Sequence, residues 1–415
     1  MTATATVPPI ETAVPGLKTR VPAGTFRATS NALLGVGAVA VIASAVTAFF
    51  GEDARKQFYF SYLVAYTFAL GIVLGAMFFV LVQHLARAGW SVVVRRVAEN
   101  IMGAMPLMVP LFLPIALGYH DLYHHWVDAV VDPLAPGYDK ILAGKRAWLN
   151  EPSFFARIVV YFLIWTLIAT WFRKKSLEQD RTGDPALTLK MARAAAPVML
   201  LYALTVTFAA IDWLKSLDPH WFSTMWGVYI FAGYVVSFFG VTALLCMWLQ
   251  KKNWLKDAVT VEHYHDIGKL LFAFMVFWAY TGFSQYMLIW YANLPEETIY
   301  YAHRAEGSWY EIGQLMIVGH FLVPFVFLMS RHMKRNRRTL AIGALILLAI
   351  HFIDLHWIVM PTLHHHGVHL SWVDFATLIG LVGLLLGVVL RNIESTPLVP
   401  ERDPRLVESL HFHNI

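Results

Sequence analysis

Long apolar stretches alternate with short polar segments along almost the whole chain. The hydrocarbon core of a bilayer is roughly 30 Å thick, so a helix needs about 20 apolar residues to cross it. Ten stretches meet this requirement, near residues 30–50, 58–83, 98–118, 154–173, 194–214, 222–249, 267–293, 308–330, 338–360 and 371–391. The pattern predicts an all-α, polytopic membrane protein of about ten transmembrane helices, named spans 1 to 10 in this order.

Two tails enclose this predicted membrane domain, which extends over residues 28–391. The N-terminal tail, residues 1–27, is rich in Thr, Pro and Ala, and the C-terminal tail covers residues 392–415. The first apolar run is longer than the hydrophobic region of a typical signal peptide. We therefore expect it to remain in the protein as span 1.

Several residues inside the spans bear on helix geometry. Prolines interrupt spans 3, 5 and 8, which bundled membrane helices tolerate. Gly71 and Gly75 form a GxxxG pattern, which is typical of close helix packing and common in membrane helices. The polar segment 174–193 predicts a surface helix between spans 4 and 5.

Basic residues are distributed unevenly between alternate connecting segments. The two tails, every second loop and the span ends beside them carry 24 of the 32 Lys and Arg residues. Cytoplasmic segments of membrane proteins carry this excess, so we expect both termini on the cytoplasmic side. The predicted outer loops differ in character, because 119–152 is long, aromatic and acidic and 361–370 holds four histidines. Such loops dock partner proteins or anchor a protein at the membrane interface, and both remain open.

Composition agrees with a membrane location and narrows the chemistry. Hydrophobic residues make up 58% of the chain and charged residues 14%, and the mean hydropathy is +0.56. The net charge of +5 fits the basic cytoplasmic loops better than a nucleic-acid partner. The single cysteine, Cys246, excludes intrachain disulfides, Cys-ligated iron–sulfur clusters and covalently attached c-type haem.

Ionisable side chains inside or near the membrane are costly and are therefore functional candidates. In the first half of the chain, His120 and Asp121 follow span 3, and Asp212 and Lys215 end span 5 near the predicted outer face. The spacing of Asp212 and Lys215 lets them pair on one helix face. The alternative is an ion pair at the membrane interface without a catalytic role.

A deeper set of ionisable groups lies in the second half. His320 is near the middle of span 8, and Pro324, four residues later, removes the helical donor of its carbonyl. His351 and Asp354 lie one helical turn apart on span 9. Such groups exchange protons and predict a proton path, whereas packing residues with internal hydrogen bonds are the alternative. The further relay candidates are Glu311 and Asp374 toward the outer face, His356 beside Asp354, and His84 and Glu99 toward the inner face.

The histidines also raise two metal-based alternatives. His320 and His351 are the pair that suits bis-histidine ligation of a b-type haem, and no second pair does. The run His364–His366 has no Cys or acidic residue beside it, which makes it weak evidence for a metal site. We therefore expect no haem, iron–sulfur cluster or bound metal in this chain.

Two motifs resemble those of a known family. The stretch Ile211–Tyr229 reads IDWLKSLDPHWFSTMWGVY, and span 9 carries Asp-Leu-His-Trp-Ile-Val-Met-Pro over 354–361. With the length and span count, they resemble the NrfD/polysulfide-reductase-type membrane subunits of bacterial alternative complex III, a quinol:cytochrome c oxidoreductase. The resemblance covers essentially the whole chain and is greatest to the smaller of the two such subunits in that complex.

The resemblance implies two four-helix bundles, spans 2–5 (about 58–214) and spans 6–9 (about 222–361), with spans 1 and 10 peripheral. It implies a place in the bacterial inner membrane, in contact with lipid. The expected partners are a larger paralogous membrane subunit, an iron–sulfur protein and cytochrome c subunits. The cofactor would be quinol, either menaquinol or ubiquinol, oxidised near the outer face.

Matched residue by residue, Asp212 takes the place of the family's acid beside the quinol headgroup, and His120 or Asp121 takes that of its histidine. Span 4 departs from the family because it has no acid, and Tyr161 and Trp165 are its nearest polar groups. The resemblance implies a subunit that contributes quinol binding, proton transfer or both. The open alternatives are a structural, proton-conducting subunit without a quinol site and an independent secondary transporter.

Overall fold

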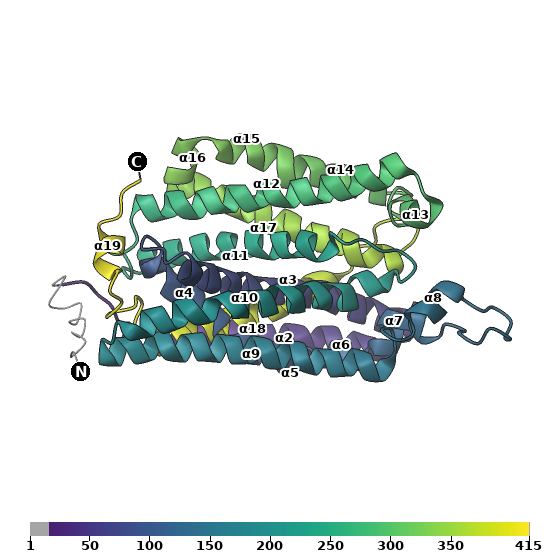
Figure 1. Cartoon of the computed structure of the whole chain (residues 1–415), viewed down its shortest axis with the longest axis horizontal. Helices are drawn as coiled ribbons and strands as arrows, with labels where there is room; N and C mark the ends of the chain where they lie inside the picture. The colour runs from purple at the N-terminus through teal and green to yellow at the C-terminus, as the bar shows by residue number, and fades with distance from the viewer. Residues whose placement is uncertain (1–15, 415) are drawn as a thin grey trace.

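The computed structural model describes residues 16–414, and this part of the chain contains helices and loops but no strand. Ten helices in it are long and apolar enough to cross a membrane (Figure 1), which confirms the predicted all-α, polytopic membrane protein. The spans are α2 (Arg27–Val46), α3 (Glu52–Leu85), the broken helix α4–α6 (Val92–Met102, Met105–Leu111 and Leu113–Leu117), α9 (Glu151–Thr182), α10 (Ala186–Trp213), α11 (Trp226–Lys251), α12 (Val261–Ala292), α14 and α15 (Trp309–Met316 and Val323–Met329), α17 (Arg337–Val359) and α18 (Trp372–Glu394).

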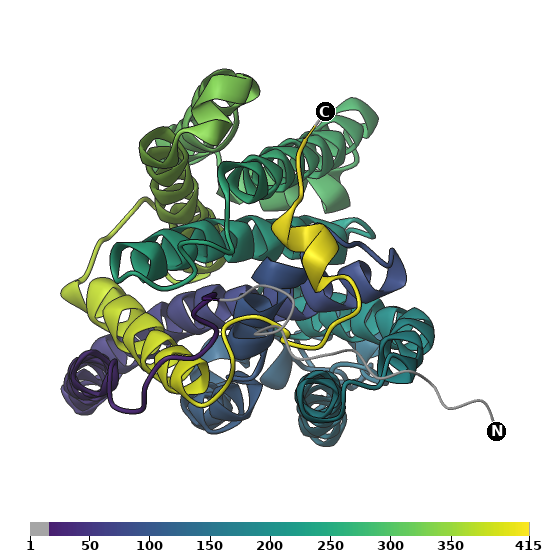
Figure 2. The ribbon, with the colours of Figure 1, turned by 90° about the vertical axis from the view of Figure 1, so that its left-hand side faces the viewer.

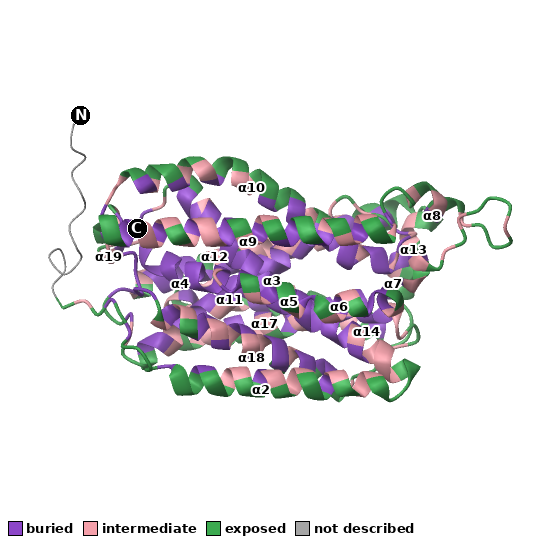
Figure 3. Cartoon of the chain, turned by 90° about the horizontal axis from the view of Figure 1, so that it is seen from below, coloured by how far each residue is buried: buried purple, intermediate pink, exposed green. Residues whose placement is uncertain are grey.

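The spans form two bundles and one outlying pair. The first bundle contains α3, α4–α6, α9 and α10, and the second contains α11, α12, α14–α15 and α17. α3 and α11 pack on each other along the seam between the bundles, whereas α2 and α18 pair at the periphery (Figure 2). In the most apolar part of α3, 94% of the residues are buried, compared with 11% in α2, so α3 is the central helix (Figure 3).

Both ends of the described chain lie at one end of the molecule, named here the terminal end (Figure 1). The opposite end is named the distal end. Three short helices occupy its loops, namely α7 (Tyr119–Val127), α8 (Lys140–Lys145) and α13 (Pro295–His303).

The described parts of both predicted tails fold onto the terminal end. Leu398 N donates to Thr19 O at 2.6 Å, and Arg20 forms an ion pair with Glu401 at 2.9 Å. A short helix, α19 (Leu406–Leu410), closes this segment. Residues 1–15 and 415 of the tails lie outside the described residues.

The seam between the bundles depends on small residues. A side chain at Gly75 would place its Cβ 2.7 Å from the carbonyl oxygen of Tyr234 on α11, and Gly71 lies against the same tyrosine ring. A contact this short leaves no room for a Cβ. The predicted close-packing face of the GxxxG pattern is therefore the face that α3 turns to α11.

The prediction of a surface helix over 174–193 is wrong. α9 continues as one helix to Thr182, Gly183 ends it in a left-handed conformation with φ 68°, and α10 begins at Ala186. The polar residues of this segment belong to the terminal-end parts of two long spans, which extend beyond the apolar stretch that a membrane requires.

Span 3 is broken into three pieces where its prolines interrupt the helical hydrogen bonds. Two backbone carbonyls of the broken region accept hydrogen bonds from tyrosines of α3. The Tyr66 hydroxyl donates to Met108 O and the Tyr62 hydroxyl to Leu111 O, both at 2.8 Å. These carbonyls are therefore occupied by side chains of the same bundle.

Candidate functional site

A deeply buried polar cluster lies in the second bundle, where α11, α12, α17 and the α14–α15 helix meet. Asp354 is buried on α17 and accepts hydrogen bonds from the Tyr229 hydroxyl at 2.5 Å and from Trp278 Nε1 at 3.1 Å. His351 Nδ1, one turn away, lies 3.4 Å from Asp354 Oδ2. The His320 ring stacks on Trp278 with centroids 3.7 Å apart and lies 5.9 Å from the His351 ring. The structure therefore brings together three predicted relay residues of spans 8 and 9.

His320 lies in an irregular turn. Between α14 and α15 the helix adopts π-helical geometry over Ile317–Leu322, just before Pro324. Such turns are rare and are frequently found at functional sites. Neither imidazole of His320 and His351 makes a hydrogen bond to another described residue. Buried polar groups normally have a partner, so these two rings are positioned to bind water, a proton or a ligand group.

The other outer relay candidates lie apart from this cluster. Glu311 is exposed at the distal start of α14. Asp374 caps the start of α18 and accepts a hydrogen bond from Ser61 Oγ at 2.5 Å. His356 is buried on α17, two residues after Asp354. Within the described residues, no hydrogen bond or ion pair joins these three groups to Asp354.

Asp212 is fully buried at the distal end of α10, and both of its carboxylate oxygens are occupied. Oδ2 accepts from Arg157 Nε and from the Tyr161 hydroxyl, each at 2.7 Å. Oδ1 accepts from Trp148 Nε1 at 2.7 Å and from Arg157 Nη2 at 3.0 Å. The guanidinium of Arg157 also lies 4.2 Å from the centre of the Trp148 ring. This carboxylate is held in a complete ion pair.

The other predicted residues near this acid have different partners. Lys215 does not pair with it on one helix face, because α10 ends before Lys215 and the residue belongs to a 3₁₀ turn, Lys215–Leu217. Its ammonium donates to a backbone carbonyl at 2.7 Å instead. Asp121 forms a two-pronged ion pair with Arg55 at 2.9 and 3.1 Å. His120 is exposed on α7, and no hydrogen bond to the buried acid is present in the described part of the chain.

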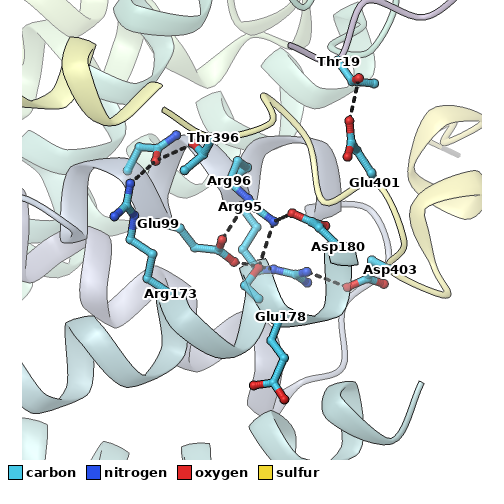
Figure 4. A network of polar contacts seen from close by, with 12 residues as sticks. Thr19, Arg95, Arg96, Glu99, Arg173, Glu178, Asp180, Thr396, Glu401 and Asp403 are labelled. Carbon is cyan, nitrogen blue, oxygen red and sulfur yellow. Dashed lines mark hydrogen bonds and ion pairs between the residues drawn. The ribbon is translucent and has the colours of Figure 1, made fainter. Parts of the chain in front are cut away.

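Glu99 lies in a buried ionic network at the terminal end (Figure 4). The ion pairs are Arg95–Glu99 at 3.3 Å, Arg95–Asp403 at 2.5 Å, Arg96–Glu99 at 3.0 Å and Arg96–Asp180 at 2.6 Å. Glu99 therefore bridges two guanidinium groups, and Asp403 and Asp180 supply the further negative charge. His84 is buried on the neighbouring helix α3, and its Nε2 has no hydrogen-bond partner among the described residues.

A cavity of about 730 Å³ lies beside the polar cluster of the second bundle. Residues of α11, α12, α13, α14 and α17 form its wall, and 11 of the 22 lining residues are aromatic. Tyr229 and Trp278 line the cavity and also donate to Asp354. These two side chains therefore connect the cavity wall to the buried carboxylate.

The cavity wall contains one cation, Arg304, which is only 5% exposed. Its Nε, Nη1 and Nη2 donate to the carbonyl oxygens of Trp357, Tyr300 and Ile358 at 3.2, 3.0 and 2.8 Å. The guanidinium lies 3.5 Å from the centre of the Tyr300 ring. Burial lowers the pKa of Arg304, and no ion pair with a carboxylate compensates its charge in the described residues.

The sequence reasoning did not single out Arg157, Arg304 or the cavity. Arg157 lies within the predicted span 4, so the cost of a cation in a span was an available signal. Arg304 counted as a residue of an outer loop, where a basic residue is ordinary. The cavity is lined by residues from several segments between positions 226 and 357, so no local sequence pattern predicts it.

No protein-family model matches this chain, and no curated protein matches it.

Proposed function

We propose that this chain is a membrane subunit of a quinol-oxidising respiratory complex of the alternative complex III type, and that its second bundle conducts protons. The contact of Asp354, His351 and His320 between the membrane-spanning helices carries the proton role. The ten-span fold and the motif over 211–229 support the respiratory role.

The geometry of the cluster suits stepwise proton transfer. Tyr229 and Trp278 donate to Asp354 and fix the orientation of its carboxylate. His351 is within reach of that carboxylate, and the His320 ring is the next titratable group toward the middle of span 8. An imidazole can accept and release a proton, so one bridging water between the two neighbouring rings would let a proton pass from one to the other.

The arrangement around Asp212 supports a structural role for this acid in the first bundle. Its carboxylate accepts four hydrogen bonds, two of them from Arg157, so both oxygens already have protein partners. A general base needs an oxygen within reach of the substrate proton. Here the indole of Trp148 lies between the acid and a groove of about 370 Å³ that Trp148 lines. Quinol oxidation at Asp212 and His120 stays a prediction.

Broken helices at the membrane midplane would favour a secondary transporter, because such helices form the ion and substrate sites of many transporters. Span 3 is broken, but tyrosines of α3 occupy the carbonyls of Met108 and Leu111. Freed carbonyls that bind a transported ion would need to face a cavity. This observation favours the subunit over the transporter.

The proton role is tested with Asp354→Asn and His351→Gln in the assembled complex in native membrane vesicles. We expect quinol-driven proton release to fall by about 10²-fold, because a positioned acid–base group contributes 10²–10⁴-fold to such a step. A pH-indicator dye measures proton release, and reduction of the electron acceptor is followed in the same sample.

Asp374→Asn is the matched control, since it removes a buried acid that caps α18 outside the cluster. We expect this variant to release protons at the rate of the unchanged complex. Normal proton release from both cluster variants, with the complex intact on a native gel, would show that the second bundle is not a proton path.

A further inference from the structure

The cavity of the second bundle has the size and lining of a small-molecule site. Its volume of about 730 Å³ is within the range of roughly 300–1,000 Å³ that ligand pockets occupy. We propose that it binds a flat, oxygen-substituted aromatic ring with an apolar tail, which is the chemistry of a quinone. The predicted quinol site lies in the first bundle, so this site is an additional one.

The aromatic wall favours a ring over an acyl chain. Half of the lining residues are Phe, Tyr or Trp, and the planar faces of such side chains stack on other aromatic rings. Trp226, Trp278 and Trp357 belong to this wall. A phospholipid tail has no planar face to use in such a pocket.

The polar groups of the wall favour a ligand that accepts hydrogen bonds. Gln285 Nε2 donates to the Tyr301 hydroxyl at 3.1 Å, which leaves the proton of that hydroxyl for another acceptor. Burial raises the pKa of Tyr301 to about 12, so the hydroxyl remains a donor at neutral pH. The Tyr300 hydroxyl and Trp357 Nε1 have no hydrogen-bond partner among the described residues. A carbonyl oxygen is the group that such donors bind.

The single cation of the wall points to a neutral headgroup rather than a phosphate. Arg304 is the one Lys or Arg residue in the lining, and each of its three nitrogens already donates to a backbone carbonyl. A phosphate is normally bound by a two-pronged guanidinium or by several basic residues. The remaining donor capacity of Arg304 suits one weakly charged oxygen.

The cavity is accessible from the side that faces lipid. Tyr280, Phe283 and Tyr286 line it from α12 and are 64%, 63% and 45% exposed on the surface of the bundle. Exposed apolar side chains of a membrane-spanning helix lie against lipid tails. A ligand with a long apolar tail can therefore place its ring inside and leave the tail in the bilayer.

On the side that faces the interior of the bundle, the cavity contacts the polar cluster through Tyr229 and Trp278, which line the cavity and donate to Asp354. A ring in this cavity would lie one side chain away from Asp354. Any exchange of protons between the ligand and the cluster rests on the proposed function. The binding of the ring does not depend on it.

Binding is tested with the purified complex in detergent, using a short-tailed ubiquinone analogue that quenches tryptophan fluorescence. The test variant is Gly313→Phe, because Gly313 lines the cavity and a Cβ there meets nothing closer than Trp357 Nε1 at 3.8 Å. The added ring has space to enter and fills the site. We expect saturable quenching in the unchanged complex and at least a tenfold increase in Kd in the variant.

The matched control is Gly35→Phe on α2, where a Cβ has no neighbour within 4 Å and the residue is exposed. We expect its Kd to equal that of the unchanged complex. Equal Kd values for Gly313→Phe and the unchanged complex, or displacement of the analogue by phosphatidylglycerol at the same concentration as by a second quinone, would overturn the proposal.

The two proposals fail in different ways. Loss of saturable quinone binding, with proton release still dependent on Asp354, overturns the cavity assignment alone. Saturable binding that Gly313→Phe abolishes, with normal proton release in Asp354→Asn, overturns the proton role alone.

Discussion

Asp212 and Arg157 show how the neighbours of a buried charge decide its role. The carboxylate is fully buried, and the Arg157 side chain that pairs with it is 14% exposed. Removing one partner of a buried pair leaves the other charge uncompensated in a medium that solvates it poorly. The pair therefore ties α9 to α10 at the distal end.

We expect Arg157→Ala to lower the free energy of unfolding by about 3–5 kcal/mol, because the buried Asp212 carboxylate would lose its counterion and two of its four hydrogen bonds. Thermal unfolding of the purified protein in detergent measures this loss. Arg55→Ala is the control, since the Arg55–Asp121 pair is 43% exposed on the arginine side and exposed pairs contribute little to stability. An equal loss of unfolding free energy in both variants would mean that the burial of Asp212 does not make its ion pair with Arg157 more stabilising than the exposed pair.

His364 is a titratable residue in a distal loop and is held in its neutral form. Burial lowers its pKa below the ordinary 6.5, the neighbouring His369 and His365 act in the same direction, and Asp374 on α18 opposes them. Its Nε2 lies 2.8 Å from Gln57 Oε1 on α3. Protonation therefore adds charge to a half-buried ring.

The sign of the pH effect follows from proton binding. Between the lowered pKa of folded His364 and 6.5, the unfolded loop binds more protons than the folded loop, so stability rises with pH in that window. We expect amide hydrogen exchange in residues 361–370 to speed up as pH falls from about 7.5 to 5.5, after correction for the intrinsic rate. His364→Gln should remove most of this response, and an unchanged pH response in that variant would assign it to another group.

At the level of elements, the apolar pattern predicted all ten spans because a bilayer demands a long uninterrupted apolar helix. It could not predict where the polar ends of α9 and α10 stop. Water and headgroups accept a helix end at many positions, so length beyond the apolar stretch carries no signal. The π turn over Ile317–Leu322 was indicated only indirectly, through Pro324 and the carbonyl of His320.

The pairing of α2 with α18 includes a very close backbone approach at Gly37. A Cβ at Gly37 would lie 2.8 Å from Gly380 O and 2.9 Å from Leu384 N. We expect Gly37→Leu to destabilise the pair by about 1–3 kcal/mol, as overpacking commonly does. The rate at which a protease cleaves the loop between α2 and α3 measures how far α2 separates from α18.

Gly35→Leu on the same helix is the control for this prediction. No atom lies within 4 Å of its Cβ position, so the larger side chain extends into the surroundings. We expect protection equal to that of the unchanged protein. Equal protection in Gly37→Leu as well would mean that α2 and α18 are held together by contacts elsewhere.

At the level of the whole molecule, the alternating basic segments and the even number of spans predicted that both termini share one end, as the described chain shows. The candidate site was predicted in part. His320, His351 and Asp354 were identified because ionisable residues in spans are costly. The contacts of Asp354 with Tyr229 and Trp278, and of His320 with Trp278, depend on the packing of two further helices, α11 and α12, which a linear pattern does not encode.

The basic bias makes the terminal end the cytoplasmic one in our proposal. We expect Leu134→Cys, at a distal loop position that is 93% exposed, to react with an impermeant maleimide in intact cells. Asn253→Cys, in the terminal-end loop after α11, should react only after permeabilisation. Both variants are made with Cys246→Ser, so that the introduced thiol is the only one. Reaction at Asn253→Cys in intact cells would show that the terminal end lies outside the cell and that the proposed orientation is wrong.

The ion pair between Arg95 and Asp403 can form only late in the synthesis of the protein. The two residues are 308 positions apart, and a ribosome adds roughly 5–20 residues per second, so Asp403 is synthesised about 15–60 s after Arg95. During that interval Arg95 shares Glu99 with Arg96 and has no second counterion. The buried ionic network at the terminal end can therefore be complete only after translation passes Asp403, so its charges are balanced last, although most of its members are made early.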